Sequence, residues 1–194
     1  MRLLLRCSVF MILLTMADVD KKALRKEMRA VLSALGQESM KERSALICTA
    51  LRERILSSEC RVVALFAPFG HEPDIWPLVE ELSMKMNVLL PKVEGDVMQF
   101  YRYGAGALCH GAFGILEPVA GTPVSPSDID VVVVPGVAFT KGGARMGRGK
   151  GYYDKYLSRE GFRGLKIGVC FSEQIVGQLP SEAHDVVMDA VISK

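Results

Sequence analysis

The sequence predicts an α/β fold: an open, mostly parallel twisted sheet with helices on both faces, and two N-terminal helices preceding the first strand. Two early stretches carry apolar residues spaced three and four apart, a spacing typical of amphipathic helices. Short β-branched runs follow, of which the four-valine run 131–134 is the clearest buried strand. A helical stretch separates the first two strand-like runs, and this order implies parallel pairing with a right-handed crossover.

Composition and charge describe an ordinary globular protein. With 194 residues, of which 49% are hydrophobic and 24% charged, the chain can bury a substantial core in one domain. A formal net charge of +2 argues against a dedicated nucleic-acid binder, because such proteins carry a strong basic excess. The cysteines are five in number, scattered, and without a Cys-x-x-Cys pair. This pattern suits a reducing compartment, so we expect a cytoplasmic protein.

The first 17 residues differ from the rest, since they combine Arg2, Arg6 and a short apolar run with no acidic residue. The run is too short to span a bilayer as a stable helix, but it fits a signal peptide or an organellar presequence. The third reading is that translation begins at Met16. We prefer this mis-assigned start, with organellar import as the alternative. The chain then divides into an N-terminal extension, 1–17, and a single domain, 18–194.

The two N-terminal helices are predicted from periodicity and from their ends. Helical spacing begins at Asp20 and continues to residue 35, and Gly36 is expected to end this helix. Ser39 followed by Glu42 is a capping-box pattern, which predicts the start of a second helix that reaches residue 55. The basic residues of the first helix are read from the pattern alone as a solvated face.

The sheet is predicted from the strand-like runs that follow. Residues 61–67 form the first strand, and Asp74 is expected to cap the helix that leads to the second strand, 87–91. Residues 98–103 alternate apolar and polar groups, as a strand with one open face does. The Gly-, Pro- and Ser-rich stretch 104–128 is read as a long surface excursion. Beyond the valine run we expect a helix at 153–157 and strands at 166–171 and 190–192.

The most informative stretch joins the valine run to the helix that follows it. Glycines at 142, 143, 147, 149 and 151 alternate with the cations Arg145, Arg148 and Lys150. Glycines let backbone N–H groups approach a ligand closely, and the cations attract phosphate oxygens. A strand-to-helix junction is also where α/β sheets present ligand sites. Ala144 and Gly151 break the mononucleotide P-loop pattern, so the alternatives are a different phosphate site or a solvated basic loop.

The chain resembles the 5-formyltetrahydrofolate cyclo-ligases, also called methenyltetrahydrofolate synthetases. The central motif of the resemblance is RMGRGKGYYD at 145–154, which follows VVPGVAF at 133–139. The other landmarks occur in the family's order and extend the resemblance over about residues 20–192; they are 21–25, Glu72, 90–92, 98–100, 114–118 and 184–185.

The resemblance implies an enzyme that uses Mg-ATP to convert 5-formyltetrahydrofolate into 5,10-methenyltetrahydrofolate, with release of ADP and phosphate. Transfer of the γ-phosphoryl group to the formyl oxygen would turn that oxygen into a good leaving group, and N10 of the folate would then close the ring. The implied partners are these two substrates, with no nucleic acid and no membrane. A monomer is expected, with a homodimer as the alternative.

The resemblance also assigns residues to the two substrates. Transition-state charge would be carried by Arg145, Arg148 and Lys150. ATP would be bound by the start of the first helix and by the glycine loop, that is by Lys21, Lys22, Ala23, Leu24, Arg25, Arg145, Met146, Gly147, Arg148, Gly149, Lys150, Gly151, Tyr152 and Tyr153. The folate would be bound by Ala67, Glu72, Met98, Phe100, Arg148, Gly149, Lys150, Gly151 and Tyr152.

Several of these roles have open alternatives. Glu72 would accept hydrogen bonds from the pterin's N–H groups, whereas Met98, Phe100 and Tyr152 are either walls of the folate pocket or ordinary core residues. The family often has an aromatic residue near Ala67, which this stretch lacks. Mg²⁺ would be held by Asp154 and Asp185 together with phosphate and water, and Asp189 competes for the second position.

Two other functions compete with the ligase reading. The first is an RNA-associated binding module that uses the basic loop and the first helix, and it predicts a steep loss of affinity with salt. The second is an inactive, folate-binding relative. The near-neutral net charge opposes the first, and the presence of all the expected cations and acids opposes the second.

Overall fold

The fold is organised around one central sheet. The computed structural model describes residues 21–104, 108–111, 114–119 and 121–194. Six strands lie in the order β10-β9-β6-β1-β2-β3, and only β2 and β3 pair antiparallel. The strands are β1 (Val62–Ala64), β2 (Asn87–Glu94), β3 (Val97–Arg102), β6 (Val131–Pro135), β9 (Leu165–Cys170) and β10 (Ala190–Ser193). The predicted open, mostly parallel sheet is confirmed.

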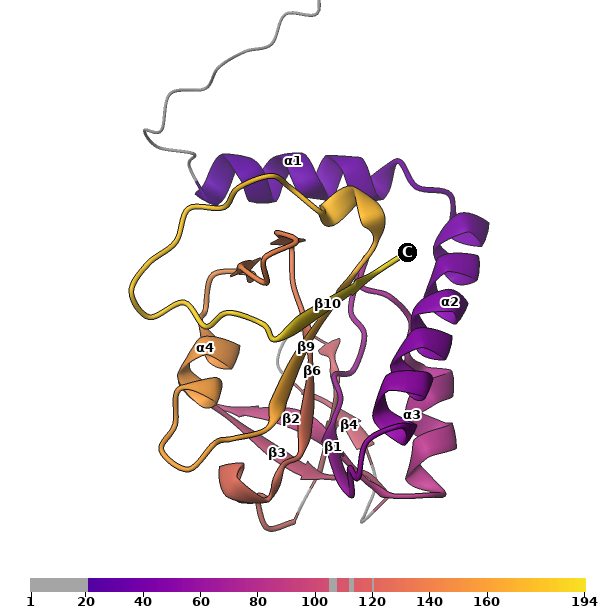
Figure 1. Ribbon diagram of the computed structural model, residues 1–194, viewed down its shortest axis with the longest axis vertical. Coiled ribbons are helices and arrows are strands. Elements are labelled where there is room, and N and C mark those ends of the chain that lie inside the picture. The colour runs from indigo at the N-terminus through magenta and orange to yellow at the C-terminus, as the bar shows by residue number, and fades with distance from the viewer. Residues whose placement is uncertain (1–20, 105–107, 112–113, 120) are drawn as a thin grey trace, which may run out of the picture.

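Helices cover both faces of this sheet, as predicted (Figure 1). The helices α2 (Gln37–Leu56) and α3 (Trp76–Ser83) bury their apolar sides on one face, and α4 (Tyr152–Leu157) covers the other. The first helix, α1 (Lys21–Ser33), crosses the end of the sheet in Figure 1. Within the described ranges, no helix is long and apolar enough to cross a membrane. The predicted extension 1–17 lies outside the described residues, so the division into 1–17 and 18–194 stays a prediction.

The central strand β6 leads directly to the glycine-rich region. Its valines alternate between the two faces: Val131 and Val133 pack with α2 and α3, and Val132 and Val134 pack with α4. A parallel strand buried on both faces reads as a continuous apolar run, which is why the run could be recognised in the sequence. Its carboxyl end at Pro135 therefore has a fixed position.

Two hairpins and the 3-10 turn at 126–128 were not expected from the sequence. The predicted excursion 104–128 contains a hairpin of β4 (Leu108–His110) and β5 (Leu116–Pro118), as well as a 3-10 turn, Pro126–Asp128; residues 105–107, 112–113 and 120 lie outside the described ones. A second hairpin, β7 (Ala138–Phe139) with β8 (Arg145–Met146), follows β6. Another 3-10 turn, Ser172–Gln174, follows β9.

Two predicted helix signals were wrong in detail. The second helix begins at Gln37 with Gly36 as its N-cap and has no side-chain cap, so Ser39 and Glu42 form no capping box. The first helix ends at Ser33, before Gly36. Asp74 does stabilise the start of α3, because its carboxylate accepts a hydrogen bond from the Trp76 N–H at 3.0 Å, although Ile75 is the N-cap residue. Local patterns thus located the helices but not their first residues.

A glycine in the turn between β7 and β8 yields the first prediction. Gly143 has φ +90°, its carbonyl accepts the Met188 N–H at 2.9 Å, and a Cβ there would lie 2.2 Å from the Met188 oxygen. We expect Gly143→Ala to destabilise the protein by about 1 to 3 kcal/mol, because it combines a left-handed backbone with a clash. Thermal unfolding followed by circular dichroism measures this. Gly142→Ala is the matched control, since its nearest neighbour is 3.8 Å away; equal melting temperatures for the two variants would contradict the prediction.

Candidate active site

The glycine loop, residues 147–151, connects β8 to α4 and is held from one side by α1. The Arg25 side chain donates its Nε–H to the Gly147 carbonyl at 2.9 Å. Gly149 has φ +108°, and a Cβ at this position would lie 3.5 Å from the Arg25 guanidinium carbon. At the end of the loop, Gly151 is the left-handed N-cap of α4, with φ 66°. The predicted proximity of the first helix to the loop is thus seen at Arg25.

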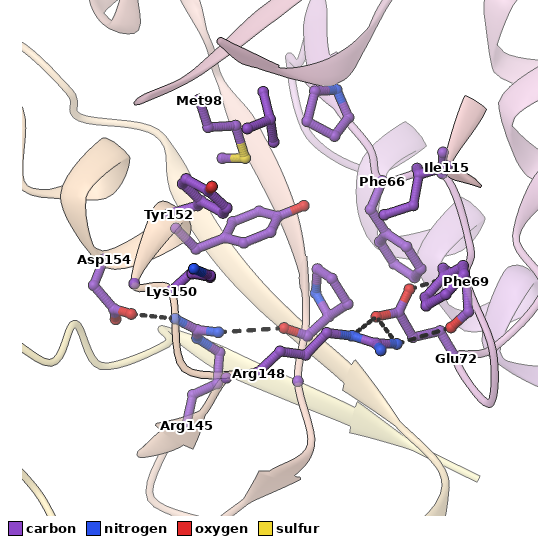
Figure 2. A pocket seen from close by; sticks show the side chains of 18 of the residues that line it. Phe66, Phe69, Glu72, Met98, Ile115, Arg145, Arg148, Lys150, Tyr152 and Asp154 are labelled. Carbon is purple, nitrogen blue, oxygen red and sulfur yellow. Dashed lines mark hydrogen bonds and ion pairs between the residues drawn. The ribbon is translucent and has the colours of Figure 1, made fainter. Parts of the chain in front are cut away.

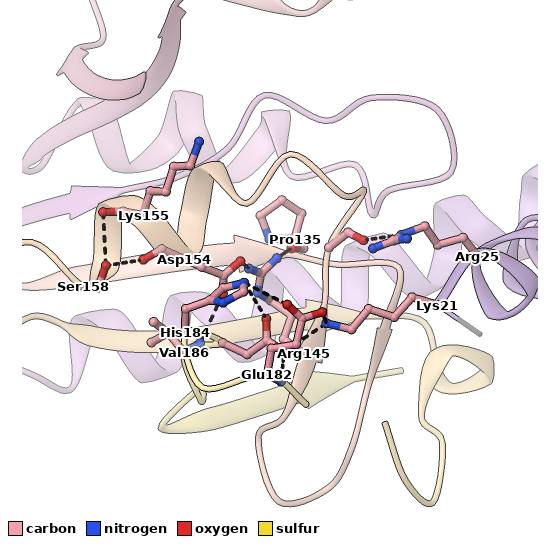
Figure 3. Close-up of polar contacts among 12 residues, drawn as sticks. Lys21, Arg25, Pro135, Arg145, Asp154, Lys155, Ser158, Glu182, His184 and Val186 are labelled. Carbon is pink, nitrogen blue, oxygen red and sulfur yellow. Dashed lines mark hydrogen bonds and ion pairs between the residues drawn. The ribbon is translucent and has the colours of Figure 1, made fainter. Parts of the chain in front are cut away.

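A buried ion pair joins the two ends of the loop. The Arg145 Nη2 lies 2.7 Å from the Asp154 Oδ2, and the two side chains are only 3% and 11% exposed. The other Asp154 oxygen accepts the Val186 N–H at 3.2 Å, which ties the C-terminal segment to α4 (Figure 3). Arg145 also donates to the Pro135 carbonyl at 3.4 Å. Arg145 therefore serves as the counterion of Asp154, and its contact with phosphate stays a prediction.

A second, more exposed ion pair connects the loop to the turn after β1. Arg148 donates from Nε and Nη2 to one Glu72 oxygen, at 3.1 and 2.8 Å, and from Nη2 to the Phe69 carbonyl at 2.9 Å. Its guanidinium carbon lies 5.0 Å from the centre of the Phe69 ring. Burial raises the pKa of Glu72, and the charge of Arg148 offsets this only in part. Two predicted substrate-binding residues are thus in direct contact.

A cavity of about 340 Å³ lies beside these pairs and is lined mainly by apolar side chains. Figure 2 shows Phe66, Phe69 and Ile115 on one side of it, and Met98, Tyr152 and Lys150 on the other. Ala67 also lines it, so Phe66 and Phe69 supply the aromatic surface that the sequence lacked at residue 67 itself. Among the described residues, the Lys150 ammonium has no hydrogen-bond or ion-pair partner.

A second cavity, of about 350 Å³, adjoins the first on the side of α1. Arg25 and Arg29 of α1 line it, together with His71 and Gln174. Four residues line both cavities: Phe69, Glu72, Gly136 and Arg148. The Arg148–Glu72 pair therefore stands at the boundary between an apolar cavity and a cationic one.

Other predicted site residues lie away from the cavities. Phe100 is fully buried and packs edge-on against Tyr156, with 4.8 Å between ring centres. Leu24 and Met146 are buried in an apolar cluster between α1 and β8. Lys22 and Ala23 are exposed on α1. The predicted contacts of these residues with ATP or folate stay predictions, and Phe100 has the packing of a core residue.

The candidate metal ligands Asp154 and Asp185 are each paired with a cation of the chain, and their contact with a metal stays a prediction. Asp185 accepts a hydrogen bond from the Lys21 ammonium at 3.2 Å. The same ammonium donates a shorter hydrogen bond to Glu182, at 2.7 Å, and this bond is the main reason why the pKa of Lys21 is raised. Asp189 instead pairs with Lys166 at 2.9 Å, beside the start of β9. Across the described part of the chain, no group of three His, Cys, Asp or Glu could hold a metal alone. Carboxylates in such small number suit Mg²⁺, which takes its remaining ligands from phosphate and water.

Comparison with known proteins decides the family. Residues 17–194 match the model of the 5-formyltetrahydrofolate cyclo-ligase family. The chain belongs to this family. It is 32% identical over 200 residues to the Saccharomyces cerevisiae 5-formyltetrahydrofolate cyclo-ligase, covering 89% of this chain and 94% of that one. It is 33% identical over 144 residues to the Mycolicibacterium smegmatis 5-formyltetrahydrofolate cyclo-ligase, and the match covers 69% of this chain and 73% of that one.

A solved structure gives the same answer for the fold of this cyclo-ligase. The NMR structure of Aquifex aeolicus 5,10-methenyltetrahydrofolate synthetase is 39% identical, has a TM-score of 0.80, and matches over 89% of each chain. The resemblance inferred from the landmark residues is therefore confirmed, as is the expectation that the chain is an enzyme of this family.

Sequence reasoning missed part of the cavity of the cyclo-ligase. Phe66, Phe69 and Ile115 line it, as does the buried acid Glu117. The two phenylalanines flank Ala67 within four residues, so an aromatic signal was present beside the expected position. Glu117 belonged to a landmark stretch, 114–118, but nothing in the sequence showed that this segment reaches the cavity.

The Arg145–Asp154 pair yields a stability prediction. In Arg145→Met the Asp154 carboxylate would stay buried without a counterion, so we expect a loss of about 3 to 5 kcal/mol in the free energy of unfolding. Urea unfolding measures it. The control is Lys155→Met, which removes an exposed cation from the same helix and is expected to change stability by less than about 0.5 kcal/mol. An Arg145→Met variant as stable as this control would show that the pair does not hold α4.

Proposed function

We propose that this cyclo-ligase converts 5-formyltetrahydrofolate and ATP into 5,10-methenyltetrahydrofolate, with release of ADP and phosphate. The observation that carries the proposal is the boundary formed by Arg148 and Glu72, since both residues line both cavities. A reaction that joins a nucleotide to a folate needs two sites that meet at the reacting atoms. The membership of the family supports the same reaction.

The character of each cavity indicates which substrate it takes. The first cavity has apolar and aromatic walls, with Met98, Tyr152 and Ala67 among them and Glu72 at its boundary, which suits a flat pterin ring with N–H donors. The second contains Arg25, Arg29 and Arg148, which suits a triphosphate. Under this assignment the γ-phosphate and the formyl group meet beside Arg148.

Under this assignment, each step of the reaction involves particular residues of this chain. The pterin's N–H groups replace Arg148 as donors to Glu72, and the released guanidinium turns to the phosphate. Lys150, which already lacks a partner among the described residues, stabilises the charge on the transferring phosphoryl group. Once the formyl oxygen is phosphorylated, N10 attacks the activated carbon and loses its proton, and the C–O bond breaks to release phosphate. Apolar walls exclude water that would compete with N10.

Magnesium enters this proposal with ATP. Asp154 and Asp185 would hold it, with phosphate oxygens and water as the other ligands, and it would neutralise charge on the phosphates. Arg145 keeps Asp154 in place, and Lys21 contacts Asp185. Asp189, which pairs with Lys166, stays the competitor for the second position. The monomeric state and the cytoplasmic location stay predictions.

The reaction is tested by mixing purified protein with 5-formyltetrahydrofolate, ATP and MgCl2. We expect the near-ultraviolet absorbance of the methenyl product to rise and an equal amount of ADP to form. Folded protein that binds the folate but forms neither product would contradict the proposal and favour an inactive folate-binding relative. RNA binding that falls steeply with salt, without ADP formation, would favour the RNA-binding module.

Lys150 yields a sharper prediction about turnover. We expect Lys150→Ala to lower kcat by about 100-fold or more, because it removes one preorganised charge from the transferring phosphoryl group. The dissociation constant for folate, measured without ATP, should change far less. Lys141→Ala is the control, since Lys141 is an exposed lysine of the preceding turn that lines neither cavity. A Lys150→Ala variant with wild-type turnover would remove Lys150 from the reaction.

A further inference from the structure

The apolar cavity contains a second buried carboxylate in addition to Glu72. Glu117 lies on β5, within the hairpin that packs beside β2, and it is only 5% exposed. It lines the same cavity as Glu72, Met98 and Tyr152. The other acids of the cavity wall, Glu72 and Asp154, are each paired with an arginine.

The hydrogen-bonding capacity of Glu117 is largely unused. Its Oε1 accepts a single hydrogen bond, from the Val93 N–H, at the long distance of 3.3 Å. No lysine or arginine of the described residues lies within ion-pair distance of it. A carboxylate can accept about four hydrogen bonds, and buried carboxylates are ordinarily paired. Burial accordingly raises the pKa of Glu117, which the Val93 N–H and the charge of Lys92 offset only in part.

The hairpin provides space for this carboxylate. A Cβ placed on Gly111 would lie 2.1 Å from the Glu117 Oε2, so any other residue at 111 would displace the acid. Gly111 hydrogen-bonds to Ile115 across the hairpin, from its N–H to the carbonyl at 2.8 Å. The hairpin therefore leaves room for the Glu117 carboxylate but donates no hydrogen bond to it from its described residues.

We propose that Glu117 is a second acceptor for the pterin ring of the folate, and this rests on the proposed function. A reduced pterin has N–H donors on two edges, namely the aminopyrimidine edge and the reduced second ring. Two carboxylates on the wall of one apolar cavity can take both sets of donors and so fix the orientation of the ring. The remainder of the folate suits Glu117 less well, because it offers one amide N–H and its own carboxylates, which a buried acid repels.

A purely structural role is the competing account of Glu117. In that account the acid only clamps β5 to β2 through the Val93 N–H. Glu117→Gln separates the two, because the amide oxygen still accepts from Val93 in a side chain of equal size. The amide's NH2 group, however, presents donors where the pterin also presents donors, so recognition would be lost while the clamp remains.

The test is calorimetric titration of 5-formyltetrahydrofolate into the whole protein without ATP. We expect Glu117→Gln to weaken binding by at least about tenfold while its melting temperature and its KM for ATP stay near those of the wild type. Titration of 5-formyl-6-methyltetrahydropterin, which lacks the aminobenzoyl-glutamate part, should show the same loss. Glu94→Gln is the control, since Glu94 is a 43% exposed acid of β2 that does not line the cavity.

Each other outcome overturns the assignment. A Glu117→Gln variant that binds folate as the wild type does, or a loss that is absent with the truncated pterin, excludes a pterin contact. A lower melting temperature with unchanged folate binding assigns Glu117 to the clamp, and a lower kcat with unchanged binding assigns it to the chemistry. If the wild type itself neither binds nor converts 5-formyltetrahydrofolate, the proposed function fails, and with it the role of Glu117.

Discussion

The glycine loop can form a site only because the Arg145–Asp154 pair holds its ends together. Glycine-rich backbone loses more conformational freedom on folding than any other, so the loop needs fixed anchors. A pair with 3% and 11% exposure has lost most of its hydration, and such a pair is tolerated when its remaining hydrogen bonds are made. Here the Val186 N–H and the Pro135 carbonyl make two of them, whereas the Arg145 Nε–H is buried without a partner among the described residues. The pair thus joins β6, β8, α4 and the C-terminal segment at one point.

The three cations of the loop differ in what binds them, and this difference separates structure from function. Arg145 is buried and paired with Asp154, so it positions the loop, and its contact with phosphate stays a prediction. Arg148 is 52% exposed, and an ion pair at such a position contributes little to stability, so a ligand can replace it without unfolding the loop. Lys150 has no partner in the described part of the chain. A sequence pattern of alternating glycines and cations therefore contains one positioning residue, one exchangeable contact and one free charge.

The sequence predicted the layers of the fold better than the walls of the site. The valine run and the βαβ order follow from burial on both faces of a parallel sheet, which leaves a local trace in residue type. The lining by Glu117 depends on how β5 packs on β2, and a contact between distant segments leaves no such trace. The prediction for Phe100 was limited in another way. Alternation along a strand predicts on which face a side chain lies, but not that α4 covers this face, where Phe100 packs against Tyr156.

The charges of the cavity wall also discriminate between the proposed ligands. A site for a nucleic-acid backbone would surround phosphates with cations and would gain nothing from buried acids. This wall combines Arg148 and Lys150 with Glu72 and Glu117, and both acids have raised pKa values because they are buried. Such a wall matches a ligand with N–H donors at one end that meets a phosphate at the other. A folate beside ATP has that distribution of charge, whereas the phosphate groups of an RNA strand offer no donors to the two carboxylates.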